Sequence, residues 1–91
     1  MSYYVYILRC KDNSLYTGFT RDVRQRVCQH NSGFRGAKSL RGKTPVVLVY
    51  LETYLTIKDA LNREREIKGW RKERKEKLVA LALNSEAMKR R

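Results

Sequence analysis

The chain has 91 residues, with 21 lysines and arginines against 9 aspartates and glutamates and a formal net charge of +12 at pH 7. A chain of this length forms one domain with a modest core, because it buries only about two-thirds of the surface that it exposes when unfolded. So many positive charges on a small surface repel one another, and we expect a nucleic acid to neutralise them. The other two explanations, that the charge only keeps the protein in solution or that it binds an anionic membrane surface, are less favoured.

Several other classes of protein are excluded. Cys10 and Cys28 have neither the CxxC spacing nor the second ligand pair of a zinc site, so we expect two reduced, packed thiols. No apolar run approaches the roughly 20 residues that span a bilayer, and the N-terminus lacks the basic and apolar regions of a secretory signal. We therefore expect a cytoplasmic protein with no membrane partner.

Residues 3–10 and 15–20 predict a β-hairpin at the start of the chain. Both segments are rich in the aromatic and β-branched residues that favour strands, and residues 11–14 between them have turn-forming side chains. Because side chains alternate along a strand, Tyr6 and Tyr16 share one face only if the loop has an odd number of residues or contains a bulge.

A helix, a cationic loop and a third strand are expected next. Residues 22–31 have valines at helical spacing and a Ser-Gly end signal, which predicts an amphipathic helix. Residues 33–44 combine glycines with lysines and arginines, as in an exposed loop. Residues 46–51 form a nearly continuous apolar run, which predicts a strand covered on both faces at the centre of a small sheet.

Two helices should complete the domain. Thr56 and the acid three residues later have the spacing of a capping box, which predicts a helix to about residue 70. A further helix is expected over residues 71–83, before a frayed tail at 85–91. No repeat or linker divides the chain, so we expect one α+β domain over residues 1–91, in the order β-β-α-β-α-α, with helices packed on a three-stranded, mainly antiparallel sheet.

Glu64 interrupts an otherwise apolar face of the predicted helix that follows Thr56. One explanation is a structural ion pair with Arg26 or another cation, and a sharper one is a ligand for a divalent metal. The residues alone leave both open. The apolar stripe that Glu64 completes at helical spacing consists of Ile57, Ala60, Leu61 and Ile67.

Asp22, Arg26 and His30 lie at four-residue intervals and so form one row on the first predicted helix. Taken singly, each has an ordinary explanation, such as a surface ion pair or a hydrogen-bonding histidine. The row becomes informative only if it converges with the tyrosines and Glu64 on one face.

Together these residues resemble the motifs of the GIY-YIG nuclease superfamily, and the resemblance covers nearly the whole chain. Tyr4-Val5-Tyr6 and Tyr16-Thr17-Gly18 are similar to the two triplets that name the superfamily. Arg26 matches its helix arginine, His30 its histidine or tyrosine one turn later, and Glu64 its metal-binding glutamate. The small stand-alone bacterial members are the most similar branch.

The resemblance implies a metal-dependent endonuclease that hydrolyses phosphodiester bonds, and our main hypothesis is that it acts on DNA at branched, nicked or otherwise distorted structures. Glu64 would bind one divalent cation, Mg²⁺ or Mn²⁺, weakly until substrate completes its shell. Tyr6 would act as general base with Tyr16 as its neighbour or substitute, Arg26 would hold the phosphate, and His30 would position phosphate or relay a proton.

Two cationic segments, the loop of residues 33–44 and the last two helices, are candidates for binding a nucleic-acid backbone. No base-reading motif accompanies them, so specificity should come from shape or from a protein partner, and DNA is favoured over RNA. Because Tyr4 stands where the first triplet has glycine, a non-catalytic nucleic-acid-binding module on the same fold is the alternative. The candidate backbone contacts are Arg35, Lys38, Arg41, Lys43, Lys68, Arg71 and Lys72.

Overall fold

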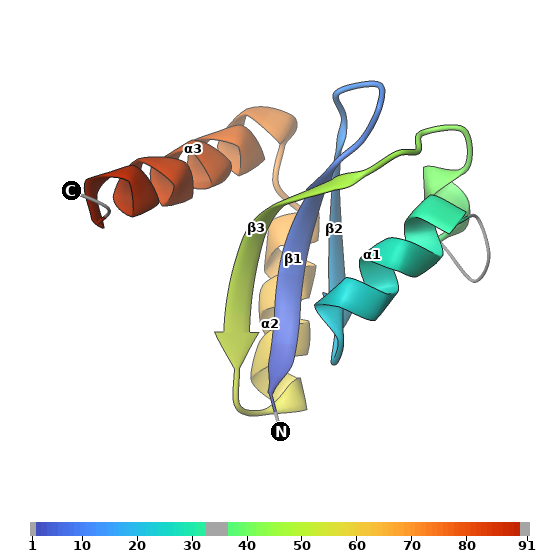
Figure 1. The fold of residues 1–91 in the computed structure, drawn as a ribbon. Coiled ribbons are helices and arrows are strands. Elements are labelled where there is room, and N and C mark those ends of the chain that lie inside the picture. The colour runs from blue at the N-terminus through green and yellow to red at the C-terminus, as the bar shows by residue number, and fades with distance from the viewer. Residues whose placement is uncertain (1, 33–36, 90–91) are drawn as a thin grey trace.

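The computed structural model of the protein describes residues 2–32 and 37–89. The predicted order β-β-α-β-α-α is confirmed, and Figure 1 shows α3 projecting away from the sheet, whereas α2 lies against it. None of the helices in the described part of the chain is long and apolar enough to cross a membrane. The elements are β1 (Tyr3–Arg9), β2 (Leu15–Thr20), α1 (Val23–Ser32), the short 3-10 helix η1 (Lys38–Leu40), β3 (Val47–Tyr54), α2 (Ile57–Lys68) and α3 (Lys72–Lys89).

β1 is the central strand of a three-stranded antiparallel sheet with the order β2-β1-β3. The expectation that residues 46–51 form the central strand, covered on both faces, is therefore wrong. Val47, Leu48 and Leu51 are exposed on this edge strand, whereas residues 5–8 of β1 are buried. A continuous apolar run predicts a strand without charged side chains, but it does not show whether that strand pairs on one side or on both.

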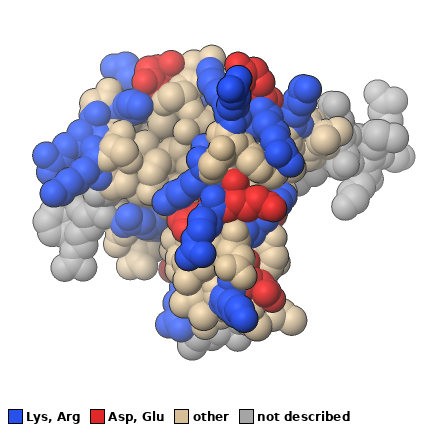
Figure 2. Space-filling view, turned by 180° about the vertical axis from the view of Figure 1, so that it is seen from behind, with Lys and Arg blue, Asp and Glu red and all other residues tan. Residues whose placement is uncertain are grey.

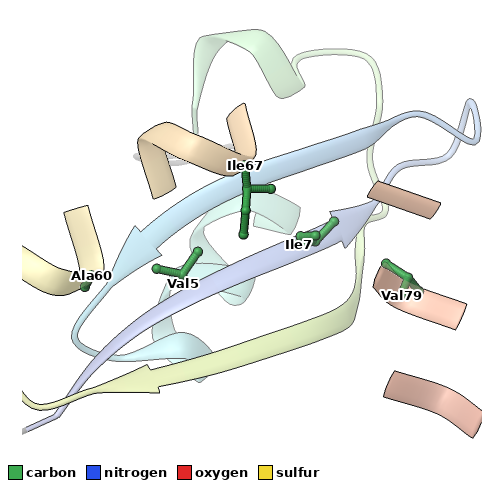
Figure 3. Packing of buried hydrophobic residues seen from close by; sticks show 5 residues of the cluster. All are labelled: Val5, Ile7, Ala60, Ile67 and Val79. Atoms are coloured by element: carbon green, nitrogen blue, oxygen red, sulfur yellow. The ribbon is translucent and has the colours of Figure 1, made fainter. Parts of the chain in front are cut away.

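Side chains of β1 alternate between two cores on opposite faces of the sheet. Tyr6 and Leu8 point toward α1 and η1, and Cys10 is buried with them, whereas Cys28 on the outer side of α1 is exposed rather than packed. The helices thus cover both faces around β1. Figure 3 shows the other core, which faces α2 and α3 and consists of Val5, Ile7, Ala60, Ile67 and Val79.

Local signals fix the starts of two helices. Thr56 is the N-cap of α2, as the capping-box spacing predicts, and its Oγ1 accepts the N–H of Asp59 at 3.2 Å. Asp22 Oδ1 accepts the N–H of Gln25 at 3.1 Å, so Asp22 caps the first turn of α1. At the other end of the chain, α3 runs to Lys89, farther than predicted, and residues 90 and 91 lie outside the described residues.

A half-buried cluster around Glu52 joins β3 to α2. Glu52 accepts hydrogen bonds from the hydroxyls of Tyr50 and Tyr54 and from Arg63, whose Nε lies 3.0 Å from Oε1. Burial alone would raise the pKa of Glu52, but the hydrogen bonds outweigh it and lower that pKa. The guanidinium carbon of Arg63 also lies 5.1 Å from the ring centroid of Trp70, which anchors the α2–α3 junction.

Candidate active site

The hairpin brings Tyr6 and Tyr16 onto one face of the sheet. Tyr16 pairs with Leu8, two residues along β1 from Tyr6, so both rings leave the sheet in the same direction. The predicted loop at 11–14 has four residues, but β1 ends one residue earlier than predicted, so the observed loop at 10–14 has five and meets the odd-number condition. The two ring centroids are 6.3 Å apart.

Gly18 gives the ring of Tyr6 room to lie across β2. Gly18 is directly opposite Tyr6 in the strand register, and a Cβ atom added to it would lie 2.4 Å from both Cζ and Oη of Tyr6. Such a contact is too short for any side chain to occupy without moving the ring. The glycine of the second triplet therefore opens the path by which Tyr6 reaches α1.

His30, at the C-terminal end of α1, holds the hydroxyl of Tyr6. Its Nε2 lies 3.1 Å from Tyr6 Oη, and its Nδ1 accepts the backbone N–H of Ala37 at 3.2 Å. Because a backbone N–H only donates, the proton of the neutral ring must be on Nε2, which therefore donates to Tyr6 Oη. Burial and the charge of Arg26 lower the pKa of His30 below its usual 6.5, so the ring is neutral at pH 7.

The environment of Tyr6 favours the protonated phenol. Burial, the neighbouring Tyr16 and the charge of Glu64 raise the pKa of Tyr6 to about 12, against the hydrogen bond and charge of Arg26, which lower it. At that pKa only about one molecule in 10⁵ carries a phenolate at pH 7. Base catalysis by Tyr6 therefore needs additional positive charge beside its oxygen.

Arg26 and Glu64 approach the tyrosines from helices on opposite sides of the sheet. Arg26, on α1, donates from Nη1 to Gln29 Oε1 at 3.0 Å, and its charge acts on both Tyr6 and His30. Glu64, on α2, is mostly buried, and its Oε2 lies 3.3 Å from Lys68 Nζ. The rings of Tyr6, Tyr16 and His30 contact one another, and the charges of Arg26 and Glu64 both act on Tyr6.

The carboxylates of the site fit only a lightly held cation. Within the described ranges no three His, Cys, Asp or Glu side chains are grouped to hold a metal ion. Glu64 alone contributes a carboxylate whose charge reaches Tyr6. Mg²⁺ commonly takes only one or two protein carboxylates when phosphate oxygens and waters complete its shell, so this donor set suits it.

The candidate backbone-binding residues around η1 differ in how far their charge is neutralised. Lys38 and Arg41 are exposed beside the buried Leu40. Lys43 is half-buried, and its Nζ lies 3.7 Å from Asp12 Oδ2. Arg35 lies outside the described residues. Lys38 and Arg41 are therefore the better placed cations of this loop.

A second group of cations lies on α2 and α3, on the side of the molecule where Figure 2 shows Lys and Arg interspersed with acidic residues. Lys68 pairs with Glu64, and Lys72 Nζ lies 3.7 Å from Glu76 Oε2, so neither charge is isolated. Arg71 is exposed between the helices. Lys75, on α3, belongs to the same cationic region, and burial and the charge of Lys68 on α2 lower its pKa.

Comparisons with known proteins agree with this geometry. The profile of the GIY-YIG catalytic domain matches residues 2–77. The UPF0213 protein of Haloquadratum walsbyi is 54% identical over 77 residues, which cover 85% of each chain. The UPF0213 protein of Staphylococcus haemolyticus is 48% identical over 77 residues, covering 85% of this chain and 93% of the relative.

Solved structures support the fold independently. The solution NMR structure of the UPF0213 protein BH0048 from Bacillus halodurans is 46% identical, has a TM-score of 0.58 and covers 89% of this chain and 85% of that chain. A solution NMR structure of a protein from E. faecalis is 34% identical, with a TM-score of 0.61 and the same coverage. The predicted fold class is therefore confirmed.

Proposed function

Since the chain belongs to the GIY-YIG family, a family of nucleases, we propose that it is a metal-dependent endonuclease that hydrolyses phosphodiester bonds of DNA. The observation that carries this proposal is the 3.1 Å contact between His30 Nε2 and Tyr6 Oη, on a phenol that the charges of Arg26 and Glu64 also reach. The cluster combines a candidate base, a phosphate-binding guanidinium and a hard-cation ligand.

Each side chain has a distinct role in the proposed reaction. Tyr6 first gives its own proton to solvent and then accepts a proton from the attacking water as that water bonds to phosphorus. The P–O bond to the leaving oxygen breaks, and solvent protonates this oxygen. His30 keeps Tyr6 Oη in place through Nε2–H, and Arg26 holds the phosphate with two parallel hydrogen bonds. Glu64 would hold the divalent cation, whose chemistry would be to stabilise negative charge on the phosphate.

Substrate choice should rest on backbone shape. The exposed Lys38, Arg41 and Arg71 suit phosphate contacts, and none belongs to a base-reading element. We therefore propose branched, nicked or otherwise distorted DNA as the substrate, with any further specificity supplied by a protein partner, and action in the cytoplasm.

The test is a cleavage assay with Mg²⁺ or Mn²⁺ on branched, nicked and linear DNA and on single-stranded RNA. Glu64→Gln removes the proposed metal ligand at nearly constant volume and should reduce cleavage by more than about 100-fold. Glu66→Gln is the matched control, because Glu66 is on the same helix but its side chain is 56% exposed and paired with Arg63. Equal losses in the two variants, or cleavage by Glu64→Gln at the normal rate, would remove the proposal.

A second candidate is a non-catalytic nucleic-acid-binding module, and the raised pKa of Tyr6 favours it. In that case Tyr6 and Arg26 hold phosphate without activating water. The protein would then bind DNA with an affinity that falls steeply with salt but is indifferent to Mg²⁺ and to Glu64→Gln. No cleavage product would form at any metal concentration.

A further inference from the structure

The outer edge of β3 and the adjoining part of α3 form an apolar surface. Leu48, Leu51 and Leu83 are 38%, 44% and 59% exposed. A pocket of about 410 Å³ lies between the strand and the helix. We call its lining the β3–α3 surface, which consists of Leu48, Val49, Tyr50, Leu51, Ala82 and Leu83.

The backbone of β3 adds hydrogen-bonding groups to this surface. Within the described residues β3 pairs only with β1, so the strand forms one edge of the sheet. Soluble proteins usually protect such an edge with lysine or another charged side chain, because its N–H and C=O groups pair readily with another strand. Residues 46–51 contain no charged side chain. The chemistry that fits this surface is therefore an extended, apolar strand.

Charge indicates which strand that is. One third of the residues are charged and the net charge is +12, yet residues 44–51 and 78–83 contain no charged residue. An acidic partner would find no cation in either segment to pair with. A second copy, in contrast, presents an equally uncharged surface and can approach here without setting lysine against lysine.

We propose that the protein forms a two-fold symmetric homodimer through the β3–α3 surface, with the two β3 edges antiparallel and the leucines packed together. An interface of this kind is self-complementary, because each copy contributes the same patch. Tyr16 lies on β2, the opposite edge of the sheet from β3, and the ring of Tyr6, on the central strand β1, lies across Gly18 of β2 with His30 beside both rings. Both candidate active sites of the dimer therefore remain open to nucleic acid.

The test is the molar mass in solution, measured by sedimentation equilibrium of the intact chain from about 5 to 500 µM. We expect a reversible monomer–dimer equilibrium that shifts toward dimer between about 0.1 and 0.5 M NaCl, because salt screens the net repulsion of the two copies. Leu51→Lys and Leu83→Lys should each weaken dimerisation roughly tenfold or more.

Leu55→Lys is the matched control. Leu55 is 83% exposed in the turn after β3 and does not line the pocket, so the variant adds the same charge elsewhere. It should dimerise like the unchanged chain, and circular dichroism should show that all three variants are folded. A monomer over the whole range, or equal weakening by Leu55→Lys, would overturn the proposal. So would a monomer that instead binds an apolar β-strand peptide. Because this experiment measures molar mass and not cleavage, a failure of the dimer proposal would leave the nuclease proposal unaffected.

Discussion

Replacing Gly18 by alanine should force the ring of Tyr6 out of its place. The added Cβ would lie 2.4 Å from Tyr6 Cζ and Oη. Since the Tyr6 side chain is only 1% exposed and contacts His30, it cannot swing aside into solvent. Adding volume at a packed position destabilises by about 1–3 kcal/mol. Replacing glycine by alanine also lowers the conformational entropy of the unfolded chain, which offsets roughly 0.5–1 kcal/mol of this destabilisation. The free energy of unfolding should therefore fall by about 1–2 kcal/mol.

A double-mutant cycle isolates the contact. Urea denaturation is measured for the unchanged chain, Gly18→Ala, Tyr6→Leu and the double variant. In the Tyr6→Leu background the added methyl meets no ring, so Gly18→Ala should be neutral or stabilising by up to about 1 kcal/mol. The resulting coupling energy is about 2 kcal/mol. If Gly18→Ala destabilises both backgrounds equally, the ring does not lie across Gly18 and the described path of Tyr6 toward α1 is refuted.

Three further predictions concern polar contacts. Glu52→Gln removes the less exposed of the two charge partners of Arg63 and leaves only Glu66, so it should lower the free energy of unfolding by about 1–3 kcal/mol in urea, and an unchanged midpoint would contradict it. His30, the only histidine, should titrate below 6.5 by NMR. As the pH falls, His30 takes up its proton in the unfolded chain before it does so in the folded chain. Its contribution to the free energy of unfolding should therefore be full above about pH 6.5 and decrease as the pH falls below that value toward the lower pKa of the folded state. His30→Gln should flatten this pH dependence between about pH 7 and 5. Arg9→Lys loses the fork of 2.7 and 2.6 Å bonds to Glu76 and should destabilise by only about 0.5–1 kcal/mol, since both side chains are about one-third exposed; a larger loss by thermal unfolding would show a role beyond this pair.

Local signals in the sequence were sufficient for most of the fold. The turn residues at 11–14 and the cap at Thr56 act within a few positions of themselves, so they predict the hairpin and the start of α2 correctly. The position of β3 depends instead on pairing between distant segments. Its apolar run was compatible with either the centre or the edge of the sheet, and only the full register shows the edge.

The candidate site divides in the same way. Side-chain alternation set the condition under which Tyr6 and Tyr16 share a face, but the predicted four-residue loop at 11–14 did not meet it. The observed loop at 10–14 does, and the ring contacts of both tyrosines with His30 agree with a common site. The role of Gly18 was missed, because its neighbour lies on another strand. The sequence also left the partner of Glu64 open, and Lys68, one turn along α2, is a cation that pairs with it. Catalytic use of the five candidate residues stays a prediction.

The proton of His30 is located by a main-chain atom. The amide of residue 37 holds Nδ1, and every amino acid except proline has that amide. Variation of the side chain at this position can therefore proceed without altering which nitrogen faces Tyr6. Ala37→Pro alone would release the ring to adopt the other tautomer, and the orientation of the phenol would change without any substitution in the cluster itself.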